Sequence, residues 1–152
     1  MNIVSTQYSL KYKSFEIYLS GCDGYCNGCH NEELWDFGAG THYKEWLPRI
    51  QEKVNMFPSL VEYIWVLGGE PLLQNKTELM DLLSFLQELE KKTVLWTRFS
   101  LEDVKKEGLL EYLWAVKVGE YREELAKDKY VSNGIQLAST NQKLIILKEE
   151  GN

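Results

Sequence analysis

The sequence has few cysteines, no long apolar run and no strongly basic segment, and each shortage excludes a class of protein. Its apolar runs, such as Leu144–Leu147, are too short to span a bilayer. Residues Met1–Leu10 lack the basic, apolar and small-residue order of a secretory signal. We therefore expect a cytoplasmic protein that has no membrane partner.

Positive charge is also scarce. The chain carries 17 Lys and Arg against 23 Asp and Glu, which gives a net charge of −6. A protein that neutralises phosphates normally presents a basic face, and no run of Lys or Arg here is longer than a pair. We expect no nucleic-acid partner, whereas a small-molecule site or a protein partner is compatible with this charge.

Nothing in the sequence divides the chain into parts. It contains no internal repeat, no low-complexity tract and no linker rich in Pro or Gly. A length of 152 residues is enough for one domain with a core and short for two. The sequence therefore predicts a single domain over residues 1–152.

Short apolar segments alternate with amphipathic ones along most of the chain, which is typical of βαβ units. The expected strands are Phe15–Ser20, Tyr63–Leu67, Thr93–Thr97 and Trp114–Val118, with a further apolar run at Leu144–Leu147. The expected helices are Tyr43–Phe57, with Pro48 in its first turn or at a kink, a second that Asn75 caps and that runs to Leu89, and a third from Ser100 to about Tyr112.

These elements predict an α/β fold with a mostly parallel sheet. A complete eight-stranded barrel typically takes about 250 residues, so we expect an open partial (β/α) barrel with helices on the outer face. Ligands of such sheets bind at the carboxyl ends of the strands. The cysteine segment, Gly-Gly-Glu-Pro, Thr-Arg and Lys-Val-Gly each follow one of the expected strands.

The three cysteines, Cys22, Cys26 and Cys29, are the strongest chemical signal. An odd, local set cannot form a disulfide framework, and clustered thiols in a reducing compartment usually bind metal. Three thiolates could hold three irons of a [4Fe–4S] cluster and leave the fourth iron open to a substrate. The alternative is a zinc ion bound by the same thiolates and His30.

The segment Gly68-Gly69-Glu70 is the second signal. Two glycines let the backbone approach a ligand closely, their carbonyls can accept hydrogen bonds from an ammonium group, and Glu70 adds negative charge. A tight exit from a strand is the alternative explanation of a Gly-Gly pair.

The cysteine spacing, with three and then two intervening residues, resembles the radical S-adenosylmethionine superfamily. Further segments resemble the activating enzymes of anaerobic ribonucleotide reductase: Ser20–Cys22, Cys26–Asn31, Trp35, Leu73–Asn75, Leu95–Thr97, Lys117–Gly119 and Ala138–Gln142. The resemblance implies a [4Fe–4S] cluster whose open iron is chelated by S-adenosylmethionine. An electron from the cluster then releases methionine and a 5′-deoxyadenosyl radical.

The resemblance also implies the contacts of S-adenosylmethionine. Gly68, Gly69 and Glu70 correspond to the motif that binds its amino group, and Lys117 is the candidate for its carboxylate, with a solvated surface lysine as the alternative. Thr97 and Arg98 are candidates for the ribose or the carboxylate. Arg98 departs from the family, which usually has Gly after the Trp-Thr pair, and Trp114 stands where an acidic residue is frequent.

Three functions follow as hypotheses. The first is a glycyl-radical activase that acts on the large subunit of an anaerobic ribonucleotide reductase and takes electrons from a flavodoxin- or ferredoxin-type donor. The second is a radical enzyme that acts on another protein, a peptide or a small molecule. The third is a zinc-stabilised binding module without catalysis.

Overall fold

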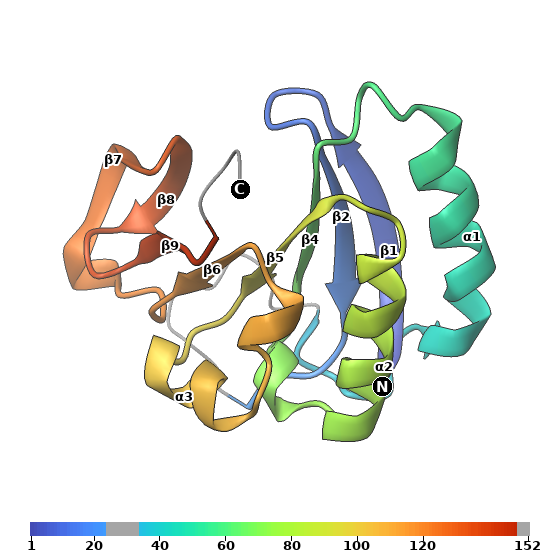
Figure 1. The fold of residues 1–152 in the computed structure, drawn as a ribbon. Helices are drawn as coiled ribbons and strands as arrows, with labels where there is room; N and C mark the ends of the chain where they lie inside the picture. The colour runs from blue at the N-terminus through green and yellow to red at the C-terminus, as the bar shows by residue number, and fades with distance from the viewer. Residues whose placement is uncertain (24–33, 149–152) are drawn as a thin grey trace.

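The structure is a computed structural model and describes residues 1–23 and 34–148. Within them, seven strands form one sheet in the order β3-β1-β2-β4-β5-β6-β9, and β7 and β8 form a separate hairpin (Figure 1). The strands are β1 (Asn2–Ser9), β2 (Ser14–Leu19), β3 (Thr41–His42), β4 (Tyr63–Gly68), β5 (Lys92–Trp96), β6 (Ala115–Val118), β7 (Ala126–Ser132), β8 (Ile135–Ser139) and β9 (Lys143–Ile146). The helices are α1 (Tyr43–Met56), α2 (Lys76–Gln87) and α3 (Leu101–Lys106), with 3₁₀ turns at Pro71–Leu73, Leu110–Tyr112 and Glu123–Leu125.

The centre of the sheet is parallel and its margins are antiparallel. Strands β2, β4, β5 and β6 pair in parallel, whereas β1 and β9 run antiparallel to β2 and β6. Helices α2 and α3 connect consecutive parallel strands, as βαβ units require. The predicted α/β class with a largely parallel sheet is confirmed.

One face of the sheet packs against the helices. Alternate residues of β2, namely Phe15, Ile17 and Leu19, are fully buried there. They share a core with apolar side chains of the three helices: Ile50 and Val54, Leu79, Leu82, Leu83 and Leu86, and Val104. No helix among residues 1–23 and 34–148 is long and apolar enough to cross a membrane.

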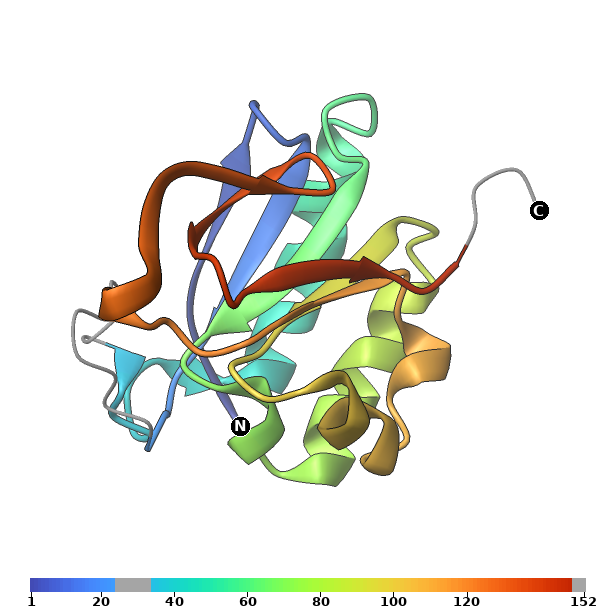
Figure 2. The same ribbon diagram turned by 90° about the vertical axis from the view of Figure 1, so that its left-hand side faces the viewer.

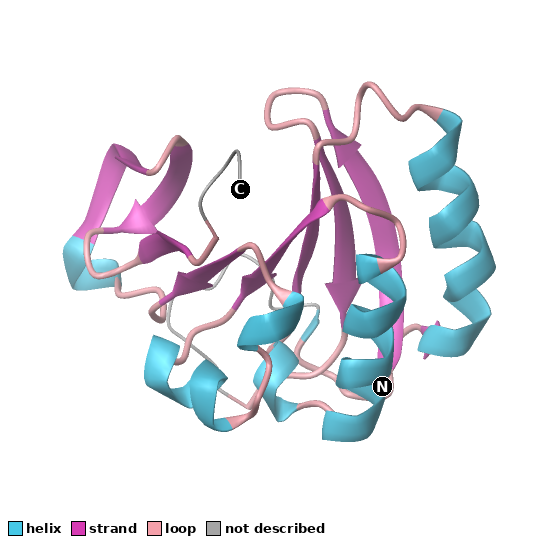
Figure 3. Ribbon diagram, in the orientation of Figure 1, coloured by secondary structure: helices cyan, strands magenta, loops and turns pink. Residues whose placement is uncertain are grey.

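The opposite face of the sheet carries the β7–β8 hairpin instead of helices. A second apolar cluster lies there, in which Trp65, Ala115 and Leu144 pack with Ile135 of β8. Figure 2 shows the hairpin in front of the sheet, and Figure 3 shows the helices on the other side. Any ligand that reaches the carboxyl ends of β4, β5 and β6 from this side must therefore share the space with the hairpin.

The expected helices form, although α2 ends at Gln87 instead of Leu89 and the position of Pro48 and the end of α3 also differ from the prediction. Asn75 caps α2 by accepting a hydrogen bond from the Glu78 backbone at 3.0 Å, as predicted. Pro48 lies inside α1, beyond its first turn. The third helix was predicted to reach Tyr112 and this is wrong, because it ends at Lys106 and Gly108 then takes a left-handed conformation with φ of 72°.

Candidate functional site

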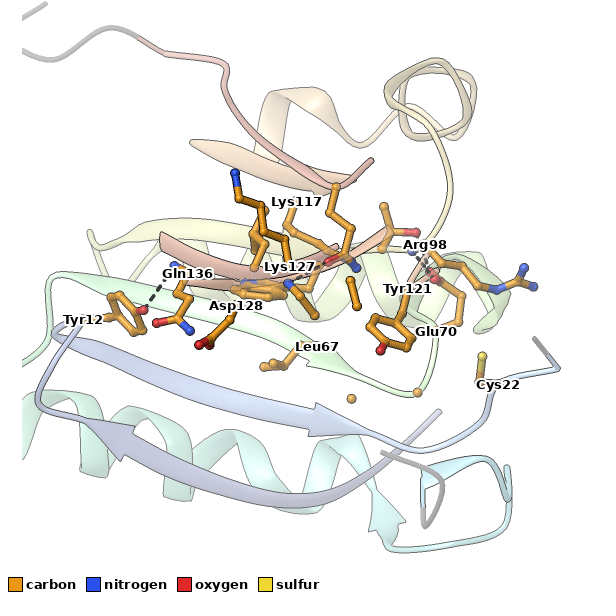
Figure 4. A pocket seen from close by; sticks show the side chains of 18 residues that line it. Tyr12, Cys22, Leu67, Glu70, Arg98, Lys117, Tyr121, Lys127, Asp128 and Gln136 are labelled. Atoms are coloured by element: carbon orange, nitrogen blue, oxygen red, sulfur yellow. Dashed lines mark hydrogen bonds between the residues drawn. The ribbon is translucent and has the colours of Figure 1, made fainter. Parts of the chain in front are cut away.

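A cavity of about 740 Å³ separates the sheet from the β7–β8 hairpin (Figure 4). Its sheet side contains Leu67 and Trp96, and its hairpin side contains Lys127, Asp128 and Gln136. Figure 4 shows Tyr12 and Gln136 at one end and Cys22, Glu70 and Arg98 at the other. The volume falls within the range of about 300–1,000 Å³ that is typical of ligand sites.

Seven of the nine predicted site residues line this cavity, each at or just beyond the end of a parallel strand. They are Cys22 after β2, Gly68, Gly69 and Glu70 at the end of β4, Thr97 and Arg98 after β5, and Lys117 in β6. The other two, Cys26 and Cys29, lie in residues 24–33, outside the described residues, as does His30. The structure thus brings the described candidates together at one edge of the sheet.

The turn after β4 interlocks with the turn after β2. The backbone N–H of Gly69 donates to the Leu19 carbonyl at 2.9 Å, and that of Glu70 donates to the Gly21 carbonyl at 2.7 Å. The Gln74 side-chain amide also donates to the Ser20 carbonyl at 2.8 Å. These bonds fix the backbone that leads into Cys22 directly beside the Gly-Gly pair.

This interlock explains why Gly69 has no side chain. A Cβ atom there would lie 2.4 Å from the Gly21 carbonyl oxygen, closer than real Cβ atoms approach. We expect Gly69→Ala to lower the free energy of unfolding by about 1–3 kcal/mol, because the backbone must shift to relieve the overlap. Denaturant unfolding of both proteins measures this difference.

Gly38→Ala is the matched control for Gly69→Ala. A Cβ atom at Gly38 meets only the Asp36 side chain, at 3.3 Å, and Gly38 is exposed. We expect its free energy of unfolding to stay within about 0.5 kcal/mol of wild type, as for most surface substitutions. Equal losses in the two variants would show that the overlap with Gly21 has no consequence.

The Glu70 carboxylate ties the ends of β4 and β5 together. Its side chain is only 2% exposed and accepts hydrogen bonds from the Arg98 backbone at 2.7 Å, the Thr97 hydroxyl at 2.7 Å and the Leu72 backbone at 2.9 Å. Burial raises the pKa of Glu70, and these three donors act in the opposite direction. Both carboxylate oxygens therefore already accept hydrogen bonds from the protein itself.

Arg98 connects the end of β5 to the segment that contains the cysteines. Its guanidinium pairs with Asp23, the residue after Cys22, at 2.6 Å. Since Asp23 is 62% exposed, we expect the pair to add little to stability. The Arg98 Nε atom is buried and has no hydrogen-bond partner among the described residues. A ligand in the cavity could supply one.

Lys117 places a cation on the cavity wall. The side chain is 8% exposed, and Nζ donates to the Gly119 carbonyl at 2.8 Å and lies 6.0 Å from the centre of the Trp96 ring. This burial excludes the solvated surface lysine considered above. The indole N–H of Trp96 is another buried donor that has no partner within the described part of the chain.

Several residues of the cavity were not predicted from the sequence. They come from the β1–β2 turn and from the hairpin with its preceding loop: Tyr12, Tyr121, Lys127, Asp128 and Gln136. The available signal was Asn133-Gly134, a pair typical of a two-residue turn between antiparallel strands. In the structure Asn133 and Gly134 have φ of 46° and 84°, as such a turn requires.

Cys22, the one candidate metal ligand among the described residues, is placed to suit an iron–sulfur cluster. Cys22 is buried and lines the cavity, and thiolates are the ligands that such clusters use. Within residues 1–23 and 34–148, no three His, Cys, Asp or Glu side chains gather as a metal site. Cys22, Cys26 and Cys29 therefore remain the candidate ligands.

Comparison with known proteins agrees with this donor set. Residues 13–145 match the family described as "4Fe-4S single cluster domain". The chain is 28% identical to the anaerobic ribonucleoside-triphosphate reductase-activating protein of Enterobacteria phage T4, over 84% of this chain and 80% of that protein. It is 27% identical to the protein of the same name from Haemophilus influenzae, over 78% of this chain and 80% of the relative. For the Pasteurella multocida protein of that name the identity is 26%, with the same coverage.

Proposed function

The chain belongs to the 4Fe-4S single cluster domain family, and we propose that it is a radical S-adenosylmethionine enzyme that generates a glycyl radical on an anaerobic ribonucleotide reductase. Three relatives that each share most of their length with this chain are named as activating proteins of that reductase. The family description also favours iron–sulfur over the zinc alternative.

One observation carries the proposal: a single cavity contains both Cys22 and the Gly68-Gly69 backbone, and hydrogen bonds from Gly69 to Leu19 and from Glu70 to Gly21 join the two turns. Cys22, Cys26 and Cys29 would hold the cluster. When bound, the cluster supplies the electron that breaks a sulfur–carbon bond of S-adenosylmethionine, and the resulting 5′-deoxyadenosyl radical takes a hydrogen atom from the target glycine.

The residues around Cys22 have separate tasks in this proposal. The carbonyls of Gly68 and Gly69 accept from the ammonium group of S-adenosylmethionine, and Lys117 pairs with its carboxylate. Glu70 and Thr97 hold the ends of β4 and β5 in register through their mutual hydrogen bond. The Arg98 Nε, which has no hydrogen-bond partner among residues 1–23 and 34–148, supports a role for that guanidinium at the ribose or the carboxylate.

The proposal extends to the shape and setting of the protein. We propose that residues 1–152 form one domain whose sheet is an open partial (β/α) barrel with helices on its outer face. Such a barrel leaves one side accessible to a loop of a large reductase subunit. We further propose a cytoplasmic location and a flavodoxin- or ferredoxin-type electron donor, as the family resemblance implies.

Lys117→Met tests the assigned contact with the S-adenosylmethionine carboxylate. We expect the Kd for S-adenosylmethionine to rise about tenfold or more, because a hydrogen bond to a charged group contributes roughly 1.5 kcal/mol or more. Equilibrium binding to the reconstituted protein measures the change. Lys143→Met, at an exposed lysine of β9 that does not line the cavity, is the control. A Kd that is the same in both variants would contradict the assignment.

The function itself is tested with the anaerobically reconstituted protein, a reductant, S-adenosylmethionine and the cognate reductase. We expect 5′-deoxyadenosine release together with the doublet of a glycyl radical in the electron paramagnetic resonance spectrum of the reductase. Release of 5′-deoxyadenosine without that doublet would contradict the activase function and would favour another substrate.

A further inference from the structure

The outer edge of β8 faces the cavity and is paired with no strand among the described residues. In the β7–β8 hairpin, Gln136 is paired with Val131. The next pair toward the turn is Ser132 with Ile135. The N–H of Gln136 points away from β7, since it donates to the Tyr12 hydroxyl at 3.2 Å. In an antiparallel strand the carbonyl of the same residue points the same way.

Side chains occupy this edge where a neighbouring strand could lie. The Tyr12 hydroxyl takes the Gln136 N–H, and the side-chain carbonyl of Gln142 takes the Ala138 N–H at 3.1 Å. We call these two side chains plugs, because each occupies a backbone N–H that a neighbouring strand could pair with. They differ in burial: Gln142 is 5% exposed and also donates to Gly119, whereas Tyr12 comes from the β1–β2 turn and is partly exposed. The Tyr12 hydroxyl is thus the plug that an incoming chain can replace.

The edge leads from one end of the cavity toward the other. Figure 4 shows Gln136 beside Tyr12, at the end remote from Cys22. From there β8 continues to Ser139, whose hydroxyl accepts from the Arg122 backbone, next to Tyr121 of the cavity wall. An extended segment that pairs at Gln136 therefore lies within the cavity, on a course toward the Cys22 end.

We propose that an extended backbone segment of the glycyl-radical partner adds to the outer edge of β8 at Gln136, in place of the Tyr12 hydroxyl. This inference rests on the proposed function and names how its substrate is held. The reacting atom of that substrate is the Cα of a glycine, which has no side chain to grip. Pairing to a strand edge positions a backbone whatever its side chains are, and it requires Gln136 to offer both its N–H and its carbonyl.

Proline substitutions at the two paired residues, Gln136 and Val131, test the proposal. Gln136→Pro removes the N–H that faces the cavity, and Val131→Pro removes the N–H of its cross-strand partner, a residue that is 56% exposed, on the opposite edge of the hairpin. Neither N–H belongs to the β7–β8 ladder, and proline is tolerated at such edge positions. Gln136→Pro also removes a side chain that lines the cavity, so Gln136→Ala, which keeps the backbone N–H, is the control for that loss.

The measurement is the Kd of the reconstituted protein for the purified reductase under anaerobic conditions. We expect Gln136→Pro to raise this Kd about three- to tenfold, the effect of losing one hydrogen bond, and Val131→Pro to leave it within about twofold of wild type. The absorption spectrum of the cluster checks that both variants fold. Equal Kd values in the two variants, whether raised or unchanged, would overturn the proposal.

Tyr12→Phe provides a second test, because it removes the plug and keeps the Gln136 N–H. The Tyr12 ring packs against Trp65 with their centres 5.3 Å apart, and without its hydroxyl the ring is no longer bonded to Gln136 and can turn aside for the incoming backbone. We expect this variant to bind the reductase at least as tightly as wild type, and weakening equal to that of Gln136→Pro would contradict a displaceable plug. If wild type binds the reductase but forms no glycyl radical, the proposed function fails while these comparisons still decide the docking edge.

Discussion

Replacing Cys22 with alanine is expected to abolish cluster binding, so that the reconstituted protein contains no stoichiometric iron and lacks the broad visible absorption of an iron–sulfur centre. Cys22 is 8% exposed at the end of the cavity and is held there by the interlocked turns after β2 and β4. Iron–sulfur clusters depend on cysteine thiolates, and the chain has only three cysteines. Iron analysis and absorption spectroscopy after anaerobic reconstitution measure the loss.

Ser20→Ala is the control for local disruption at Cys22. Ser20 is fully buried two residues earlier, and its hydroxyl donates to the Phe37 carbonyl at 3.2 Å, so its removal disturbs the same turn without touching a thiolate. We expect this variant to bind the cluster as wild type does. A Cys22→Ala protein that still carries a full complement of iron would contradict the assignment of Cys22 as a ligand.

Glu70→Ala is expected to lower the free energy of unfolding by about 3 kcal/mol or more, since it leaves three donors unpaired at a cost of about 1–3 kcal/mol for each group. The lost acceptor serves the Leu72 backbone, the Thr97 hydroxyl and the Arg98 backbone at once. Because the same carboxylate joins the ends of β4 and β5, binding of S-adenosylmethionine should weaken as well. Denaturant unfolding and equilibrium binding measure the two effects.

Glu62→Ala is the matched control for loss of a carboxylate. Glu62 is 46% exposed and pairs with Lys92 at 3.6 Å, an arrangement that contributes at most about 1 kcal/mol. We expect a small change in stability and unaltered binding of S-adenosylmethionine. If Glu70→Ala were no more destabilising than Glu62→Ala, the three hydrogen bonds of Glu70 would not hold the ends of β4 and β5 together.

The parallel centre of the sheet could be predicted because its strands are buried on both faces. Tyr63–Leu67 and Thr93–Thr97 are short, nearly continuous apolar runs, and the structure places strands there within a residue or two. Strand β1 could not be recognised in the same way. Only Ile3 of β1 is fully buried, so the segment shows no apolar alternation, and its pairing with β2 creates the strand.

The β7–β8 hairpin was missed although Asn133-Gly134 predicts its turn. Most residues of β7 are exposed, and Lys127, Asp128 and Lys129 interrupt any apolar pattern. A hairpin that folds over the face of a sheet needs few buried side chains of its own, and Ile135 and Leu137 supply them here. The contribution of the hairpin to the cavity therefore could not be predicted from the sequence.

That the site residues lie close together could be predicted from strand order alone. The hydrogen-bond and ion-pair partners of their side chains could not. Cys22, Gly68-Gly69 and Lys117 lie at one edge of the sheet because each is at or just beyond the end of a parallel strand. Glu70 is different, because its carboxylate turns to the backbone of Arg98, 28 residues further along the chain. The ion pair between Arg98 and Asp23 likewise depends on how two turns approach in space.

Electron paramagnetic resonance of the dithionite-reduced protein, recorded before and after S-adenosylmethionine is added, tests most directly whether this cavity holds an iron–sulfur cluster next to S-adenosylmethionine. We expect the signal of a single reduced [4Fe–4S] cluster and a change of that signal on addition, because S-adenosylmethionine would contact the cluster between Cys22 and the Gly68-Gly69 backbone. A colourless protein that contains zinc and gives no signal, or a cluster signal that S-adenosylmethionine leaves unchanged, would contradict this expectation.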